Sequence, residues 1–203
     1  VPRGEGGGLY LATTGVGIKD KSLKLGMDRI RASDAILVSG HIGDHGIAVM
    51  FAREQFGLRG DLQSDSASVY PLTSALHALP GLRFMRDPTR GGLAMIANEI
   101  ARATGLGVRL MQPAIPIRPP VVSVCEMLGY DPLYLACEGR VVAVIAPDQA
   151  DIALKAWKQL PQGSDAAIIG VMENSRPHVV LQTELGGERV LEELEDDPLP
   201  RIC

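Results

Sequence analysis

The sequence has few aromatic residues, little net charge and no long apolar run. Aromatics make up only 4% of the 203 residues, so the core must consist mainly of aliphatic side chains, Ala and Met. A formal net charge of −4 without a dense Lys/Arg block excludes a general nucleic-acid binder. No window approaches the roughly 18 to 20 apolar residues that span a bilayer. With 46% hydrophobic and 22% charged residues, the chain is predicted to be soluble and folded rather than disordered.

Cysteine and histidine are too scattered to indicate a disulfide framework or a structural zinc site. The three cysteines, Cys125, Cys137 and Cys203, are odd in number and have no repeating spacing. A reducing compartment, the cytoplasm, is therefore expected. His41 and His45 are four residues apart, but no CxxC or HExxH motif accompanies them. We therefore predict no metal ligands from this pattern.

The N-terminal residues read as the middle of a protein. The chain begins at Val1 without Met and without a charged-then-apolar leader, so no signal peptide is expected. A glycine-rich start leads into a predicted strand at residues 9–14. We interpret residues 1–18 as the end of a preceding domain and a linker, and expect the chain to lack the N-terminal part of a longer protein. Residues 19–187 are then the main domain, and 188–203 an acidic, flexible tail ending in Cys203.

The main domain mixes strands and helices without strict βαβ alternation. In the clearest helix, residues 93–104, apolar side chains recur at three-and-four spacing. This order favours an α+β fold in which helices flank a mixed, mostly antiparallel sheet. The expected strands are 35–39, 82–86, 108–111, 133–136, 140–146, 166–172 and 178–183, and the expected helices are 47–56, 72–79, 93–104, 121–128 and 147–160.

A glycine-rich loop, Asp87-Pro-Thr-Arg-Gly-Gly92, precedes the clearest helix. Gly91 and Gly92 in a first helical turn each cost about 1 kcal/mol relative to Ala. Close approach of a ligand to bare backbone N–H groups is one compensating reason, and a helix N-terminus beside Arg90 suits a phosphate or carboxylate. The alternative is a plain N-cap in which Asp87 or Thr89 accepts backbone hydrogen bonds. Both alternatives stay open.

A second glycine-rich loop, residues 39–46, is neither a dinucleotide fingerprint nor a Walker A loop. Asp44 and His45 at its end are either a ligand-binding or acid/base pair, or part of a capped helix start. From the residues alone we favour the capped start.

Glu138 and Cys203 are two further candidates for chemistry. Glu138 stands at a predicted turn between two apolar strands, where partial desolvation would raise its pKa and make it a usable base. The alternative is an ordinary solvated glutamate. Cys203 follows Pro198 and Pro200, which stiffen a short arm able to present a thiol. Alternatively, the thiol is an incidental feature of the chain end.

These segments together resemble the HypE family of hydrogenase maturation factors, within the PurM-like (aminoimidazole ribonucleotide synthetase) ATP-binding superfamily. The glycine loops alone indicate only the superfamily, whereas the ending Pro-Arg-Ile-Cys203 selects this branch. The resemblance runs through Thr13-Thr-Gly-Val-Gly17, residues 39–46, residues 87–92, Cys137-Glu-Gly139 and Pro200-Arg-Ile-Cys203.

The resemblance implies an enzyme that dehydrates a carbamoyl group. HypF would place the group on the terminal cysteine sulfur, ATP would drive dehydration of the S-carboxamide to a thiocyanate, and the HypC–HypD complex would receive the cyanide for the [NiFe]-hydrogenase iron. It also implies a PurM-like C-terminal domain with α/β/α layers. The implied residues are Cys203 as carrier thiol, Glu138 as base, Asp87, Thr89, Arg90, Gly91, Gly92 and Arg3 for ATP, and Asp44 and His45 for substrate.

The resemblance places the main Mg²⁺ ligands and the dimer interface in an N-terminal domain that is largely absent here. A lysine that the family usually places just before the segment matching residues 1–3 is also absent, which leaves Arg3 alone, so we do not expect this chain alone to turn over. Two alternatives remain. One is another PurM-like, ATP-dependent amide-activating synthetase, which would need no tethered thiol, and the other is a non-catalytic carrier or docking module.

Overall fold

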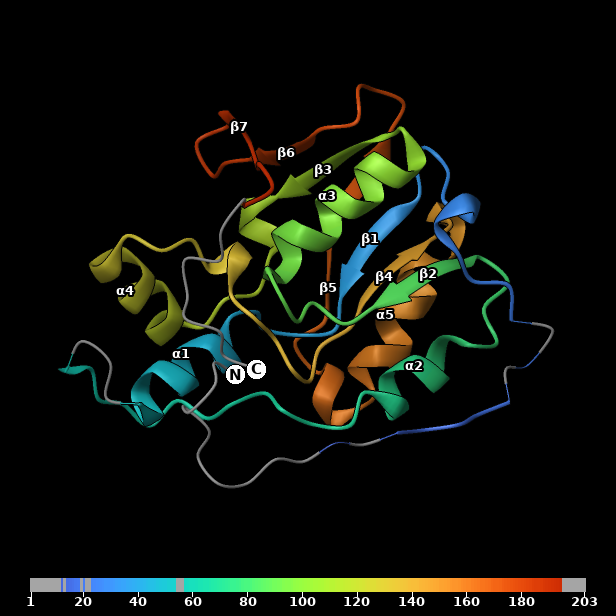
Figure 1. Cartoon of the computed structure of the whole chain (residues 1–203). Coiled ribbons are helices and arrows are strands. Elements are labelled where there is room, and N and C mark those ends of the chain that lie inside the picture. The colour runs from blue at the N-terminus through green and yellow to red at the C-terminus, as the bar shows by residue number, and fades with distance from the viewer. Residues whose placement is uncertain (1–11, 13, 19, 21–22, 54–56, 195–203) are drawn as a thin grey trace.

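A computed structural model describes residues 12, 14–18, 20, 23–53 and 57–194, and its centre is a seven-stranded sheet (Figure 1). The strand order is β2-β4-β1-β5-β3-β6-β7. Every neighbouring pair is antiparallel except β3 and β6, so the predicted mixed, mostly antiparallel sheet is confirmed. The strands are β1 (Ala35–Val38), β2 (Leu82–Arg86), β3 (Gly107–Met111), β4 (Val142–Ile145), β5 (Ala167–Glu173), β6 (Val179–Gln182) and β7 (Glu188–Val190).

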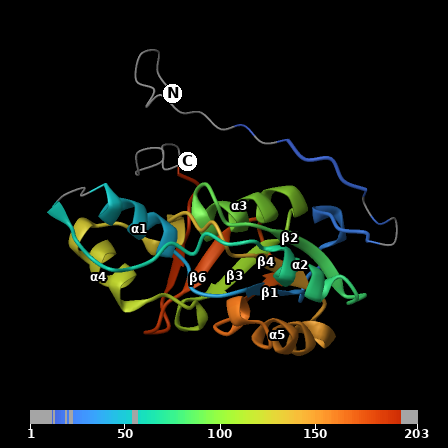
Figure 2. The ribbon, with the colours of Figure 1, turned by 90° about the horizontal axis from the view of Figure 1, so that it is seen from below.

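Helices flank both faces of this sheet. Figure 2 shows α3 on one side of the strands and α5 on the other, and α2 packs beside α5. The helices α1 and α4 lie together beyond the ends of the central strands (Figure 1). In the described part of the chain, no helix has the length and apolar character needed to cross a bilayer. The helices are α1 (Asp44–Ala52), α2 (Tyr70–Leu76), α3 (Gly92–Thr104), α4 (Pro119–Leu128) and α5 (Ala150–Lys158), with short 3-10 turns η1 (Met27–Arg29), η3 (Gln112–Ala114), η4 (Pro132–Tyr134), η5 (Pro147–Gln149) and η6 (Pro161–Gly163).

The alternation of side chains along the central strands creates two apolar cores. In β1, Ile36 and Val38 belong to the core beneath α3, whereas Ala35 and Leu37 belong to the core beneath α2 and α5. All four are buried, as expected for a strand covered on both faces. Trp157 of α5 is also fully buried, and its indole N–H donates to a backbone carbonyl of α2 at 2.8 Å. The layered α/β/α arrangement is thus held mainly by aliphatic packing, with Trp157 as an aromatic anchor on the α5 side and Phe84 in the core beneath α3.

The predicted strand at 133–136 is wrong. Residues 132–134 instead form η4, whose start is capped because the Asp131 side chain accepts a hydrogen bond from Leu133 N at 3.0 Å. Beyond η4 the chain bonds to the first turn of α1 rather than to a strand: Gly46 N donates to Ala136 O at 3.3 Å. Leu133 is buried in the core beneath α3 and Leu135 in the cluster with α1 and α4, without a sheet ladder.

The predicted tail is wrong for its first residues. Glu188–Val190 forms β7, which pairs with β6 at the sheet edge, and Leu191 is 1% exposed in the core beneath α3. Residues 195–203, with Cys203, lie outside the described residues, as does most of the predicted strand at 9–14. The domain boundary near residue 18 therefore stays a prediction.

Candidate functional site

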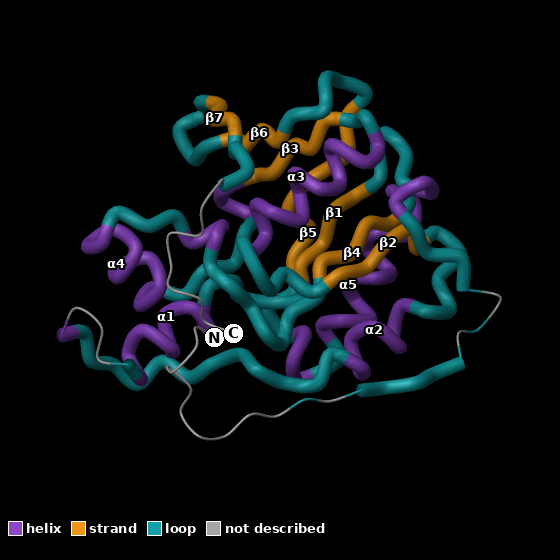
Figure 3. Tube along the Cα trace, in the orientation of Figure 1, coloured by secondary structure: helices purple, strands orange, loops and turns teal. Residues whose placement is uncertain are grey.

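The segment of residues 135–140, between η4 and β4, lies among three loops. Cys137 N donates to Pro88 O at 2.9 Å, and Gly43 N donates to Cys137 Sγ at 3.3 Å. Glu138 N donates to Asp65 Oδ1 at 3.0 Å. Figure 3 shows several loops gathered between α1 and the strands of the sheet. Both predicted glycine loops and a third loop around Asp65 therefore meet at one short segment.

Glu138 is not at the turn of a hairpin, because residues 133–136 form no strand. It is instead half-buried within the 135–140 segment, and its backbone is held by Asp65. The next residue, Gly139, has no room for a side chain, since a Cβ there would lie 1.8 Å from the backbone oxygen of Asp65. The loop of Asp65 is thus pressed directly onto the backbone that carries Glu138.

Arg140 joins the same loops through a guanidinium that is only 12% exposed. Its Nε donates to His41 O and its Nη1 to Gln162 O, both at 3.0 Å. The group also lies 3.4 Å from Asp65 Oδ2 and 3.9 Å from Asp44 Oδ2. Arg140 is therefore a buried cation that two carboxylates and two backbone carbonyls surround.

Asp44 and His45 open α1. The N-cap is Gly43 with a φ of 82°, so a glycine supplies the tight geometry expected for this helix start, although no side chain caps the helix. The Asp44 carboxylate is 3% exposed and accepts from Arg118 Nε at 3.0 Å. Burial raises the pKa of the Asp44 carboxyl, and the hydrogen bond from Arg118 opposes that shift. His45 is half-buried, with Nδ1 2.9 Å from Ser64 Oγ.

The loop of residues 87–92 is more open than the loop before α1. Asp87 and Arg90 are exposed, and neither forms an ion pair with the described residues. Helix α3 has Gly91 as its N-cap, and no side chain caps it. Thr89 contributes only its backbone oxygen, which accepts from Gly92 N at 3.1 Å. Of the two alternatives for this loop, a side-chain cap by Asp87 or Thr89 is therefore not observed.

Glycine is required at position 92 because another segment of the same chain lies against its backbone. Its φ is 58°, and a Cβ at this position would lie 2.5 Å from Leu135 O and 2.6 Å from Leu133 O. Only glycine allows α3 to approach the 133–135 backbone this closely. Close approach of a ligand was one of the two alternatives for the glycine pair, whereas at Gly92 the approaching backbone belongs to the same chain.

The described cysteines are unsuited to nucleophilic chemistry. Cys137 is fully buried, and burial raises the pKa of its thiol to about 12. Cys125 is buried as well, with its thiol pKa raised to about 11 for the same reason. Cys203 and Arg3 lie outside the described residues. Within the described ranges, no three His, Cys, Asp or Glu side chains are grouped as metal ligands.

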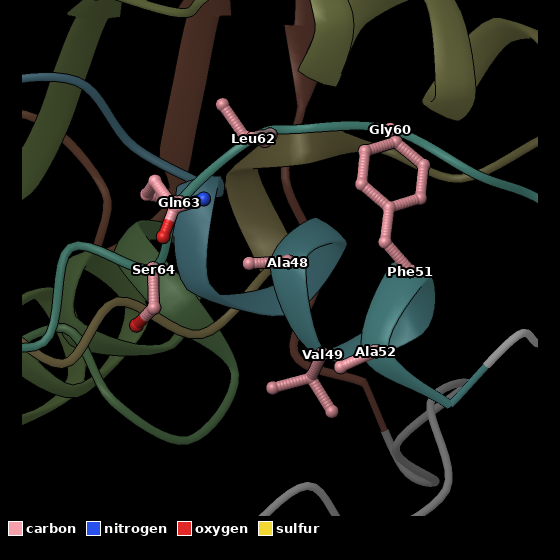
Figure 4. Close-up of a pocket in the computed structure, with 8 residues that line it drawn as sticks. All are labelled: Ala48, Val49, Phe51, Ala52, Gly60, Leu62, Gln63 and Ser64. Carbon is pink, nitrogen blue, oxygen red and sulfur yellow. The ribbon is translucent and has the colours of Figure 1, made fainter.

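A hollow of about 390 Å³ adjoins the contact between His45 and Ser64. It lies between the outer face of α1 and the loop that leads to Asp65. Figure 4 shows the Phe51 ring against Gly60 at one end and Ser64 at the other. None of its lining residues is charged, so the hollow borders the site without contributing an ionisable group. They are Ala48, Val49, Phe51, Ala52, Gly60, Leu62, Gln63 and Ser64.

Sequence reasoning missed Asp65, Arg118 and Arg140. Asp65 stands in a polar, aperiodic stretch, Gln63-Ser-Asp-Ser-Ala-Ser68, that gives no pattern to single it out. Arg118 and Arg140 are isolated arginines beside predicted elements. Their importance follows from contacts between residues far apart in the chain, such as the hydrogen bond between Asp65 and Glu138, which are 73 positions apart.

The sequence matches a known family model and curated proteins. The model described as "AIR synthase related protein, C-terminal domain" matches residues 31–182. Carbamoyl dehydratase HypE of Azotobacter vinelandii is 45% identical over 205 residues, which cover 100% of this chain and 60% of that protein. Carbamoyl dehydratase HypE of Escherichia coli K12 is 40% identical over 203 residues, with coverage of 100% and 60%. The chain thus spans about 60% of the length of these relatives.

Solved structures of HypE also match this chain. The crystal structure of E. coli HypE matches with a TM-score of 0.83 and 40% identity, covering 89% of this chain and 56% of that chain. HypE in complex with ATP matches with a TM-score of 0.80 and 39% identity, covering 88% and 55%. A HypE–HypF complex matches with a TM-score of 0.80 and 37% identity, covering 84% and 56%.

Proposed function

The chain belongs to the family of AIR synthase related proteins, C-terminal domain, and from this membership we propose that it is part of a carbamoyl dehydratase that serves [NiFe]-hydrogenase maturation. Relatives named carbamoyl dehydratase HypE match along the whole chain. The observation that carries the proposal is the position of Glu138, whose backbone is fixed where the loops before α1 and α3 meet.

In the proposed reaction, an S-carboxamide on Cys203 loses the elements of water at the expense of ATP. The carboxamide oxygen attacks the γ-phosphorus, ADP leaves, and one N–H proton is lost. The C–O bond then breaks with phosphate as the leaving group, and loss of the second N–H proton forms the C≡N bond. The net products are a thiocyanate, ADP and phosphate. Phosphorylation is needed because oxide is a far poorer leaving group than phosphate.

Glu138 is the proposed base for the N–H protons. A general base must lie within hydrogen-bond reach of the proton that it takes, so a fixed backbone at Glu138 favours this role. Cys203 is the carrier that the resemblance implies. The other two cysteines of this chain, Cys125 and Cys137, are buried and their thiol pKa values are raised, so neither suits this role.

For ATP, we propose that the phosphates bind at the start of α3. The first turn carries no side-chain cap and Arg90 is exposed, which suits an anion at a helix N-terminus. The residues assigned to ATP here are Asp87, Thr89, Arg90, Gly91 and Gly92, together with Arg3.

The described residues offer no cluster that fits Mg²⁺. We therefore expect its main ligands in the N-terminal part that the relatives possess, and derive no step through the metal. Asp44 and His45 are the residues proposed for substrate. Because Asp44 is already paired with Arg118, we assign the direct contact to His45 and a supporting charge to Asp44.

The proposed partners follow from the same resemblance. HypF would supply the carbamoyl group, and the solved HypE–HypF complex supports this partner. HypC–HypD would receive the cyanide, and the full-length protein would act as a cytoplasmic homodimer.

Mass spectrometry of the intact full-length protein tests the proposal. With HypF and carbamoyl phosphate, we expect a carbamoyl adduct that the Cys203→Ser variant lacks, and addition of ATP should remove one water from it. The Glu138→Gln variant should form the adduct but lose water about 10²- to 10⁴-fold more slowly, the usual contribution of a general base. Glu184→Gln, a change at an exposed glutamate between β6 and β7, is the matched control and should behave as the unmodified protein.

Other outcomes would favour the alternatives. An adduct that ATP leaves unchanged indicates a carrier or docking module. Absence of any adduct indicates another PurM-like synthetase that acts on a free substrate. Full activity of Glu138→Gln would remove this residue from the chemistry.

A further inference from the structure

Asp65 is a buried carboxylate within an exposed stretch of chain. Its side chain is 0% exposed, although Ser64 and Ser66 on either side are exposed. Burial of a charged carboxylate is unfavourable unless the group is paired and hydrogen-bonded. This position therefore requires a compensating interaction, and the partners of its two oxygens identify one.

The two oxygens of Asp65 contact the Arg140 guanidinium and the backbone N–H of Glu138, the proposed base. Oδ1 accepts from Glu138 N at 3.0 Å, and Oδ2 lies 3.4 Å from Arg140 Nε. Arg140 is in turn held by the carbonyls of His41 and Gln162. A continuous set of polar contacts thus runs from these two carbonyls through Arg140 and Asp65 to Glu138.

Steric contact tightens this connection. A Cβ at Gly139 would lie 1.8 Å from Asp65 O and 3.0 Å from Ala67 N, so the two backbones are in direct contact. Ser64, the neighbour of Asp65, contacts His45 Nδ1 through its hydroxyl at 2.9 Å. The backbone at Glu138 cannot shift without displacing the loop of Asp65, and that loop also contacts His45.

We propose that Asp65 is a positioning residue for Glu138, acting through the Glu138 backbone N–H while Arg140 holds the Asp65 carboxylate in place. Asp65 itself touches no substrate. The inference rests on the proposed function, because it takes Glu138 as the base. Proton transfer depends steeply on geometry, and a displacement of about 1 Å can cost on the order of 100-fold in rate.

The test measures the two steps of the proposed reaction separately in the full-length protein. In Asp65→Asn the amide must either present its NH₂ group to Arg140, placing donor against donor, or turn and lose the bond to Glu138. We expect the single-turnover rate of ATP-dependent water loss to fall by about 10- to 100-fold. Carbamoylation by HypF and KM for ATP should stay unchanged. The unfolding temperature should fall, because Arg140 loses a buried charged partner, so the rates are compared at a temperature at which the variant is fully folded. Asp61→Asn, at an exposed aspartate of the same loop, is the matched control and should change nothing.

Two further variants keep the test decisive. Arg140→Lys retains the charge but loses the planar fork, and should slow the same step more mildly. Asp65→Asn combined with Glu138→Gln should be no slower than Glu138→Gln alone, because a residue that acts through Glu138 has nothing left to position.

The inference is overturned if Asp65→Asn matches Asp61→Asn, if its effect adds to that of Glu138→Gln, or if Asp65→Asn and Arg140→Lys impair carbamoylation and dehydration equally. These results differ from a failure of the proposed function. That failure would appear as a fully active Glu138→Gln, whereas an inactive Glu138→Gln with a fully active Asp65→Asn removes the positioning role alone.

Discussion

The two glycine loops begin their helices in the same way. The loop of residues 39–46 contains Gly43 with a φ of 82°, and that of residues 87–92 contains Gly91 with a φ of 67°. Both glycines are left-handed N-caps without a side-chain cap, and both loops hydrogen-bond to Cys137. The backbone solution is therefore shared, and any difference in role must come from the side chains and from what the loops contact.

The charges of the two loops differ. In the first loop, Asp44 is buried and bonded to Arg118. In the second, Asp87 and Arg90 are exposed and form no ion pair with the residues that the structure describes. A loop whose buried carboxylate is paired with an arginine of the same chain is suited to support, whereas one with exposed, unpaired charges is suited to an ionic ligand. The same local backbone can thus serve as scaffold in one place and as a binding loop in another.

The largest expected effect comes from Gly92→Ala, which tests how the loops are packed. The new Cβ would meet two backbone oxygens at a φ of 58°, and backbone atoms cannot move aside as side chains can. The left-handed conformation alone should cost about 1–3 kcal/mol of the free energy of unfolding, and these contacts should increase the loss. The loss should be smaller in Gly43→Ala, where the nearest atoms, at 2.9 and 3.2 Å, belong to the side chains of Val121 and Leu135. Urea unfolding of the chain measures both.

Gly105→Ala is the control for this prediction. Gly105 has a φ of 71° with nothing within 4 Å of an added Cβ, so its variant reports the conformational cost alone, about 1 kcal/mol. Equal losses in all three variants would show that backbone conformation, rather than close packing, determines the cost at Gly92.

A smaller effect, in the pH dependence of stability, should distinguish the buried acid of the first loop. Burial raises the pKa of Asp44 above 3.8, although Arg118, Arg140 and His41 face this carboxyl. A raised folded-state pKa means that the stabilising contribution is complete below pH 3.8 and is lost as the pH rises through the higher value. The free energy of unfolding of Asp44→Asn, relative to the unmodified chain, should therefore increase across that interval. Asp34, whose pKa is also raised, contributes equally to both proteins and cancels.

Denaturant unfolding at closely spaced pH values above 3.8 provides the measurement. Asp87→Asn is the matched control because this aspartate of the second loop is exposed, and its curve should run parallel to that of the unmodified chain. If the Asp44→Asn curve is parallel as well, burial does not raise the pKa of the Asp44 carboxyl in the folded protein.

The elements predicted correctly were those whose burial follows a local pattern. Strand β2 has the predicted bounds. Helix α3 was predicted to within one residue at its start, because its apolar side chains repeat with the helix period. The error at residues 133–136 has the opposite origin. Leu133 and Leu135 are buried two residues apart, as in a strand, but Leu133 packs in the core beneath α3 and Leu135 packs between α1 and α4. Strand β7 was missed because its residues are exposed and only edge pairing orders them.

The candidate site was predictable only in part for a similar reason. Unusual glycines mark both loops in the sequence, and the Cys-Glu-Gly motif marks Glu138. Asp65 and Arg140 carry no such mark, because their roles depend on contacts made only when distant segments pack together. Local composition therefore reveals where the backbone is unusual, and it does not reveal which charges hold that backbone.

The smallest expected effect on stability, combined with a clear effect on binding, belongs to Arg90→Ala. An exposed arginine without an ion pair should contribute less than about 0.5 kcal/mol to the free energy of unfolding. If the second loop binds the ATP phosphates, loss of a charge-assisted hydrogen bond of about 1.5 kcal/mol should raise KM for ATP about tenfold in the full-length protein. Arg176→Ala, at an exposed arginine between β5 and β6, should leave KM unchanged. An unchanged KM in Arg90→Ala would mean that the exposed charge of this loop is not a phosphate contact, and the contrast between a supporting loop and a binding loop would then reduce to burial alone.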